Sequence, residues 1–258
     1  MTSTRTGYVF DNDYVHAVDQ HRYLTECYDA LTCSRLAETG VSLGWRCWEI
    51  GAGGGSVADW LVRRVGPTGS VLATDIRPIR PYVHTHEVVH DPLPDGEFDL
   101  IHARLVLMHL PERDAVLRKL LRALRPGGWL QLDEPDIGYC PVLLSPDRRA
   151  AELYEAFQAA KEVLLAEAGA DGTWGRKVAG AMAAAGFVAV DPLPVVYPWR
   201  AGSPGVRLQI NHTHHLRDKL IAAGMTEQDL AEVRALLADE RFRASSTVMY
   251  SVHGRRPL

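Results

Sequence analysis

A run of glycines could bring the backbone of this chain close to a ligand. Residues 51 to 55 are four glycines and one alanine, which let the chain turn sharply with no Cβ in the way. Gly53, Gly55 and Ala58 satisfy the dinucleotide-binding pattern G-x-G-x-x-G/A, and Asp75 stands twenty residues beyond Gly55, where an acid that binds a ribose is expected. An NAD-dependent oxidoreductase is therefore one interpretation of this weakly specific pattern.

Three acids accompany the glycines. Glu49 precedes the first glycine by two positions, Asp75 closes the second predicted strand, and Asp91 precedes the third. Carboxylates at three successive strand ends suit a zwitterionic nucleoside, whose ammonium and hydroxyl groups they can bind, better than a pyrophosphate. An oxidoreductase with a catalytic Tyr-x-x-x-Lys pair is also disfavoured, because neither Tyr154 nor Tyr197 has a lysine four residues on.

Three further side chains are candidates for acid or base catalysis. Glu134 follows a predicted strand at its carboxyl end, although a solvated loop carboxylate is an equally good interpretation. His109 is as easily a structural histidine as a catalytic one, and His214 fits a base that faces a substrate. The motifs Gly-x-Ser-x-Gly and His-Glu-x-x-His and the P-loop pattern are absent, which argues against hydrolases, zinc proteases and NTPases.

The run His212-x-His214-His215 also raises a metal hypothesis, since imidazoles at such spacing can share a zinc ion. No cysteine is nearby to complete a structural site, and Asp218 is the only close carboxylate. We therefore predict no metal site. The four cysteines form no CxxC pair, so reduced, structural thiols are expected.

The elements that must position these residues alternate between strand and helix. The apolar patterns predict strands at 46–50, 70–74, 98–103, 129–133, 186–196 and 245–253. They predict helices within 14–36 and at 56–65, 111–124, 150–168, 175–185, 215–223 and 227–239. Residues 200 to 215 are expected to be irregular. This alternation predicts an α/β fold with a doubly wound, mostly parallel sheet, whose ligands bind at the carboxyl ends of the strands.

The stretch from Trp45 to Asp136 resembles the class I S-adenosylmethionine (SAM) dependent methyltransferases. The similarity is to the small-molecule group that includes the enzymes of ubiquinone and menaquinone biosynthesis and many bacterial natural-product enzymes. It rests on E-x-G-x-G-x-G from Glu49, V-L-A-T-D ending at Asp75, H-D-P-L-P-D-G-E-F-D-L-I from His90, L-M-H-L-P from Leu107 and L-R-P-G-G-W-L from Leu124. The resemblance implies a Rossmann-like, seven-stranded sheet with N-terminal helices and an inserted helical or irregular cap over the cleft.

The resemblance also implies a SAM site. Its residues would be Glu49, Gly51, Ala52, Gly53, Gly55, Asp75, Ile76, Asp91, Pro92, Ala103 and Arg104. The loop would meet the aminoacyl part of SAM, with Glu49 holding the loop or the ammonium. Asp75 would accept hydrogen bonds from both ribose hydroxyls, and Asp91 one from the adenine amino group. Ile76 and Pro92 would wall the adenine ring.

Two further residues, Ala103 and Arg104, would lie beside the methionine part of SAM. The fifteen residues between Asp75 and Asp91 include Pro78 and Pro81 where relatives usually carry a helix, so we expect that helix to be shortened or lost.

The function that the resemblance implies is methyl transfer from SAM to an O, N or C atom of a small-molecule metabolite, with S-adenosyl-L-homocysteine as product. The bacterial-style composition favours a place in secondary metabolism. A SAM-binding protein of the same fold that does not methylate is the alternative hypothesis, and an NAD-dependent oxidoreductase is the third. The candidate substrate-binding residues are Tyr14, Tyr197, Trp199 and His215.

Composition limits the organisation and the partners. We expect an N-terminal helical cap at 1–44 and a SAM-binding domain at 45–258, with a substrate-covering insertion around 137–175 and 198–226.

The net charge of −4, without a Lys/Arg block, disfavours nucleic acid as a partner. No signal peptide and no run of about 18 apolar residues is present, so no membrane partner is expected. A cytoplasmic monomer or homodimer is the expected state.

Overall fold

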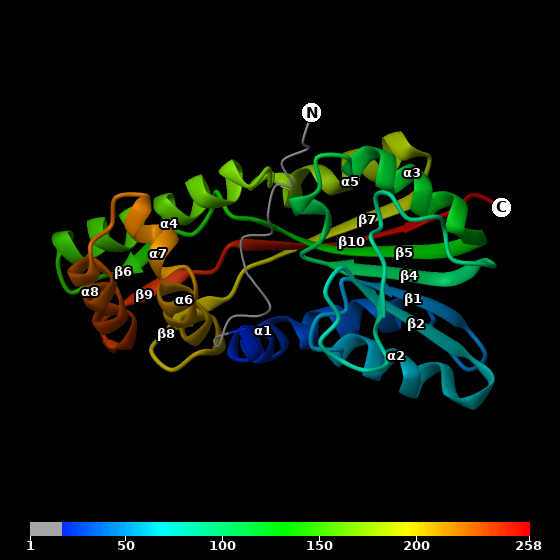
Figure 1. Ribbon diagram of the computed structural model, residues 1–258, viewed down its shortest axis with the longest axis horizontal. Helices are drawn as coiled ribbons and strands as arrows, with labels where there is room; N and C mark the ends of the chain where they lie inside the picture. The colour runs from blue at the N-terminus through cyan, green and yellow to red at the C-terminus, as the bar shows by residue number, and fades with distance from the viewer. Residues whose placement is uncertain (1–16) are drawn as a thin grey trace. The chain divides into compact units, whose positions relative to one another are not determined.

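The computed structural model describes residues 17–258 (Figure 1). The candidate substrate residue Tyr14 lies outside the described residues. The helices are α1 (Ala17–Glu38), α2 (Ser56–Val65), α3 (Arg113–Ala123), α4 (Arg148–Glu167), α5 (Trp174–Ala185), α6 (Pro204–His215), α7 (Arg217–Ala222) and α8 (Glu227–Ala238), with 3₁₀ turns η1 (Gly66–Thr68) and η2 (Leu107–His109). The strands are β1 (Arg46–Ile50), β2 (Ser70–Asp75), β3 (His84–Thr85), β4 (Phe98–Arg104), β5 (Leu124–Asp136), β6 (Val142–Leu144), β7 (Val188–Val195), β8 (Pro198–Arg200), β9 (Arg243–Ser245) and β10 (Val248–Arg255).

The chain divides into two compact units, each built from separate stretches of sequence. The first unit contains the residues up to Cys27 together with Ile137–Gly172 and Val196–Val248. The second unit contains Tyr28–Asp136, Thr173–Val195 and Met249–Leu258. The helix α1 therefore contributes residues to both units. The domain boundaries expected from the sequence stay a prediction.

The second unit is built on a seven-stranded sheet in the order β3-β2-β1-β4-β5-β10-β7. Strand β1 pairs in parallel with β2 and β4, β4 with β5, and β2 with β3, whereas β10 and β7 are antiparallel. Helix α2 lies on one side of this sheet and α3 and α5 lie on the other (Figure 1). The prediction of a doubly wound, mostly parallel seven-stranded sheet is confirmed.

Burial explains why these residues form the centre of the sheet. Strand β1 contributes Trp48 and strand β4 contributes Phe98 and Leu100, all without solvent exposure, as expected for strands that are covered on both faces. Helix α2 buries the apolar stripe that includes Val57 and Leu61 against the strands. Because Ile50 pairs with both Thr74 and Ala103, the carboxyl ends of β1, β2 and β4 meet at one edge.

The stretch after β2 contains no helix before Asp91. The strand β3 is its only regular element, and it is two residues long. The expected loss of the helix is confirmed, and Pro78 and Pro81 supply a reason, because proline lacks the N–H that a helix interior requires.

The first unit packs α4, α6, α7 and α8 around a core that contains Tyr154, Phe157 and Phe242. It also contains a three-stranded sheet in the order β6-β9-β8, which the sequence patterns did not predict. The prediction that residues 200 to 215 are irregular is wrong. Helix α6 begins at Pro204, because the Ser203 side chain accepts a hydrogen bond from the Val206 N–H and proline is favoured in the first turn.

The four cysteines are free thiols. No helix within residues 17–258 has the length and apolar character needed to cross a membrane.

Candidate functional site

The glycine loop between β1 and α2 requires glycine at three positions. Gly51, Gly53 and Gly55 have φ values of 68°, 48° and 83°, in the left-handed region that other residues rarely adopt. A Cβ at Gly51 would also overlap a methyl group of Val106, and a Cβ at Gly55 would overlap the hydroxyl of Tyr82. The loop thus needs glycine both for its backbone conformation and for the close approach of Val106 and Tyr82.

Asp75, at the end of β2, ties the glycine loop to the sheet. One oxygen of its carboxylate accepts a hydrogen bond from the Gly53 N–H at 2.9 Å, and the other accepts one from the Arg77 N–H at 2.9 Å. The side chain is mostly buried. A carboxylate has about four lone-pair positions, so each oxygen can accept one more hydrogen bond, for example from a ribose hydroxyl.

Glu49 is buried at the end of β1 and binds a histidine that the sequence patterns missed. The sheet register places Glu49 opposite His102 of β4, and the two side chains are joined by a hydrogen bond of 2.7 Å between Oε2 and Nδ1. The other imidazole nitrogen of His102 lies 3.2 Å from Oδ2 of Asp133 on β5. The three side chains form a buried row of alternating charge beneath the loop.

The charges of this row stabilise one another. Burial alone would lower the pKa of His102, but the neighbouring carboxylates of Glu49 and Asp133 outweigh it and raise the pKa to about 9. Burial would raise the pKa of Asp133, but its hydrogen bonds to the imidazole, Ser251 and Thr32 lower it to about 2. His102 is therefore an imidazolium at neutral pH and donates to both carboxylates. The remaining oxygen of Glu49, Oε1, makes no hydrogen bond within residues 17–258, which leaves it as a possible acceptor for an ammonium.

Arg104 joins the end of β4 to helix α1. Its guanidinium donates to Oδ1 of Asp29 at 2.9 Å and to the hydroxyl of Thr32 at 3.1 Å, and Thr32 in turn donates to Asp133 at 2.6 Å. Ala103, beside Arg104, is completely buried. This arrangement anchors α1 at the edge of the sheet where the predicted cofactor residues gather.

Glu134 is fully buried at the end of β5. Its carboxylate accepts hydrogen bonds from the backbone N–H groups of Val106, Leu107 and Met108 at 3.2, 2.7 and 3.2 Å. Burial raises the pKa of Glu134 to about 7 despite these donors. The geometry is that of a carboxylate that fixes the turn η2, and the catalytic role of Glu134 stays a prediction.

His109, the last residue of η2, is half-buried. Burial, followed by the positive charge of Arg113, lowers the pKa of His109 to about 4. The imidazole is therefore neutral at pH 7, which is the form a general base requires. Its catalytic role also stays a prediction.

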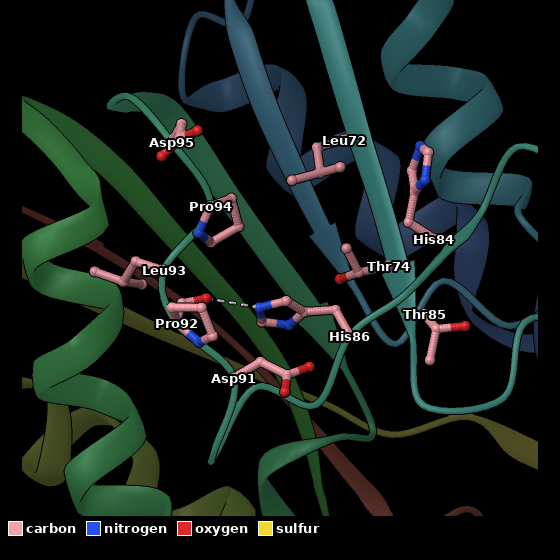
Figure 2. Close-up of a pocket in the computed structure, with 10 residues that line it drawn as sticks. All are labelled: Leu72, Thr74, His84, Thr85, His86, Asp91, Pro92, Leu93, Pro94 and Asp95. Atoms are coloured by element: carbon pink, nitrogen blue, oxygen red, sulfur yellow. Dashed lines mark hydrogen bonds between the residues drawn. The ribbon is translucent and has the colours of Figure 1, made fainter.

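Asp91 and Pro92 line a cavity of about 440 Å³ beside β2 (Figure 2). The Asp91 carboxylate accepts a hydrogen bond from the Glu87 N–H at 2.7 Å, and His86 Nε2 donates to the Pro92 carbonyl at 3.1 Å. The cavity contains neither the glycine loop nor Asp75. Asp91 and Pro92 are the only predicted cofactor residues in its lining, and Ile76, which is 56% exposed, is not part of it. The binding of adenine there stays a prediction.

Two residues of the stretch that replaces the helix reach the glycine loop. Arg80 donates to the Gly54 carbonyl at 3.1 Å, and the Tyr82 hydroxyl donates to Asp59 of α2 at 2.9 Å. The sequence analysis did not single out either residue, because nothing in a proline-rich irregular segment indicates where it folds back.

All eleven predicted cofactor residues belong to the second unit, and those of the glycine loop and the strand ends meet at one edge of its sheet. Tyr197, Trp199, His214 and His215 belong to the first unit. Trp199 is 4% exposed and packs in the core of that unit, and His214 and His215 end helix α6. Within residues 17–258, no group of three or more His, Cys, Asp or Glu side chains could hold a metal ion.

Comparison with known proteins agrees with this geometry. A family described as "Methyltransferase domain" matches residues 21–191, well over half of the chain. Methyltransferase str2 of Strobilurus tenacellus is 40% identical over 98 residues, which are 34% of this chain and 34% of that protein. The ubiquinone/menaquinone biosynthesis C-methyltransferase UbiE of Cupriavidus necator is 31% identical over 107 residues, 36% of this chain and 44% of that protein. The similar stretch thus spans less than half the length of these curated relatives.

The fold is also found in solved structures. A putative methyltransferase of Haloferax volcanii, solved in complex with the Trm112 methyltransferase activator, superposes with a TM-score of 0.57 at 13% identity, covering 97% of this chain and 98% of that one. At this identity the likeness shows the shared fold alone.

Proposed function

Since this chain belongs to the methyltransferase domain family, as its resemblance to the class I SAM-dependent enzymes predicts, we propose that it transfers a methyl group from SAM to an O, N or C atom of a small-molecule acceptor. The observation that carries the proposal is the edge of the sheet where Asp75 holds a left-handed glycine loop above the buried carboxylate of Glu49. That edge is where ligands of open α/β sheets bind.

The residues present fit SAM. The glycine loop offers backbone without side chains, Glu49 has an oxygen available for an ammonium, and Asp75 has lone pairs available for two hydroxyls. SAM supplies the electrophilic sulfonium methyl group when bound. The chain's own contribution is to orient and desolvate the reactants, and a base is needed only if the nucleophile must lose a proton. The neutral imidazole of His109 is the candidate for that base in the second unit.

The acceptor class and setting of this reaction are part of the proposal. The name of the UbiE relative describes methylation of a small molecule, and a net charge of −4 makes a polyanionic acceptor such as nucleic acid unfavourable. We assign the enzyme to secondary metabolism and to the cytoplasm, where four free thiols are stable. A monomer or homodimer is the expected oligomeric state.

The test is calorimetric titration of the wild type and Asp75→Asn with SAM and with NAD. In the variant, the NH₂ group of the side-chain amide would face a backbone N–H that now donates to the carboxylate, so the glycine loop would lose one of its anchors. We therefore expect SAM to bind the variant at least tenfold more weakly, a loss of about 1.4 kcal/mol of binding free energy. Asp114→Asn, on the exposed side of α3, is the matched control.

NAD binding in place of SAM, or SAM binding that ignores Asp75, would overturn the cofactor assignment. SAM binding without S-adenosyl-L-homocysteine formation with any acceptor would favour a SAM-fold protein that does not methylate.

A further inference from the structure

A polar cluster in the first unit joins helices α4 and α6. The Lys161 ammonium donates to Oε1 of Gln158 at 2.9 Å and to Oε1 of Gln209, and the Gln158 amide donates to the same Gln209 oxygen at 3.2 Å. The ammonium lies 4.9 Å from the centre of the Phe157 ring. Two of its three N–H groups are therefore used on neutral amide oxygens.

This partly buried ammonium has no carboxylate beside it among residues 17–258. In the part of the chain that the structure describes, no Asp or Glu oxygen lies within 4.0 Å of the Lys161 Nζ. A cation removed from water without a counter-ion is costly, so such a group is uncommon unless a ligand supplies the missing charge.

The two titratable neighbours of Lys161 are uncharged at neutral pH. Burial raises the pKa of the Cys140 thiol, which therefore does not become a thiolate counter-ion. Burial, followed by the charges of Lys161 and His215, lowers the pKa of His212 well below its usual value. Neither the Cys140 thiol nor the His212 imidazole therefore supplies a negative charge to Lys161. Burial lowers its pKa to about 8, so it remains mainly an ammonium at pH 7.

Helix α6 buries polar side chains to an unusual degree. Its buried polar residues are Gln209, Asn211, His212, Thr213 and His215. A helix that only packed against a core would bury an apolar stripe and expose its polar groups. Helix α6 also buries Val206 and Leu208, so its buried polar groups come in addition to an apolar contact. Polar groups that converge in a mostly apolar setting are typical of small-molecule sites.

We propose that Lys161, held by Gln158 and Gln209, binds an anionic oxygen of a small-molecule ligand and so selects ligands that carry a carboxylate, phenolate or enolate group. The remaining N–H of the ammonium makes a charge-assisted hydrogen bond to that oxygen. This inference goes beyond the proposed methyl transfer, because it assigns an anion site to residues of the first unit alone, which the sequence analysis did not consider.

The test measures the reactivity of Lys161 in the full chain without SAM. Trace acetylation with acetic anhydride across a pH series, read by mass spectrometry, gives the rate and titration midpoint of each lysine. The probes are 4-hydroxybenzoate for a carboxylate, 4-nitrophenol at pH 8 for a phenolate, and benzamide, which has no ionisable group in this range, as the uncharged control. Exposed Lys177 and Lys219 are internal references.

We expect at least one anionic probe to slow acetylation of Lys161 tenfold and raise its midpoint, with Lys177 and Lys219 unchanged. The anionic probe that protects Lys161 shows whether the site prefers a carboxylate or a phenolate. Protection by neither anion, or equal protection by the amide, would overturn the proposal.

Gln209→Glu tests the proposal more directly, because it places a carboxylate where the side-chain amide of Gln209 now contacts Lys161 and keeps the size and shape of that side chain. We expect a raised midpoint for Lys161 without any probe and loss of protection by the anions, whereas Lys219→Gln behaves like the wild type. Undiminished protection in Gln209→Glu would contradict the assignment. SAM titration of the same proteins tests the proposed methyl transfer separately from the anion site at Lys161. A wild type that fails to bind SAM would contradict methyl transfer, and the acetylation of Lys161 would still test the anion site.

Discussion

His102 carries the positive charge that stabilises two buried carboxylates, Glu49 and Asp133, beneath the glycine loop. Replacing it with alanine leaves Glu49 and Asp133 buried without the cation between them. Removing one partner of a buried ion pair costs about 3–5 kcal/mol, so we expect His102→Ala to lower the free energy of unfolding by that amount at pH 7. Urea unfolding measures it. His84→Ala, at an exposed histidine, is the control, and an equal loss in both variants would contradict the role of the row.

The same prediction has a pH dependence with a definite sign. The pKa of His102 rises from 6.5 when unfolded to about 9 when folded, so its contribution is complete below pH 6.5 and is lost as the pH rises through 9. The difference between wild type and His102→Ala should therefore shrink between pH 6.5 and 9.5. A difference that stays constant over this range would show that His102 is neutral in the folded protein.

At this scale the sequence predicts which residues lie at the strand ends but not what they contact. Glu49 and Asp75 stand next to glycines in a recognisable spacing. His102 is found only from the parallel register that sets it opposite Glu49, and register depends on contacts between residues far apart in sequence. Lys161 carries no local signal, because what distinguishes it is that no carboxylate of residues 17–258 lies close to it in space.

The glycine loop is the element whose shape the candidate site depends on, and Gly51 tests it. Gly51→Ala places a left-handed alanine against Val106, whereas Gly40→Ala imposes the same backbone cost where no atom lies within 4 Å. We expect Gly40→Ala to lose about 1–2 kcal/mol of stability and to bind SAM normally. Gly51→Ala should lose about 1–3 kcal/mol more and bind SAM at least tenfold more weakly. Thermal unfolding and calorimetry measure both effects.

Partial recovery in Gly51→Ala combined with Val106→Ala would support the steric explanation. If Gly51→Ala matched Gly40→Ala in both measurements, the close approach to Val106 would have no consequence for the site.

Elements with strong periodicity were predictable, and the exceptions have physical reasons. The helix at 113–123 and the parallel strands follow from their apolar spacing. Helix α6 was missed because its buried residues mix polar with apolar side chains, so hydropathy carried no clear helical period. Ser203 and Pro204 do form an N-terminal capping signal. Strand β5 begins at Leu124 and runs through Pro126 and two glycines. Proline and glycine have a low propensity for strands, but the pairing of β5 with β4 outweighs that propensity.

For the whole molecule, the two proposed ligands should protect different units. Hydrogen exchange of the full chain with SAM should slow the amides of residues 51–55 and 75–77, and exchange with 4-hydroxybenzoate should slow the opening of α4 and α6. SAM at one hundred times its Kd should also stabilise the fold by about 2.7 kcal/mol. Exchange that slows only in the first unit on adding SAM would contradict the location of the cofactor site.

The division into units was the least predictable feature at this scale. The chain passes from one unit to the other five times. A linear reading places insertions at 137–175 and 198–226, which fall largely within the first unit, but assignment to a compact unit depends on long-range contacts that no single segment reveals.

Strand β10 has a consequence for synthesis of the protein. It occupies a place between β5 and β7, so the seven-stranded sheet cannot close until residues 248–255 have left the ribosome. Until then, the adjoining edge of β5 and the whole of β7 present unpaired backbone groups, the condition under which nascent chains pair with one another. Slow translation of the stretch that encodes β10, or a shortage of chaperones, should therefore lower the yield of folded protein more than either would in a chain whose sheet is completed by an earlier strand.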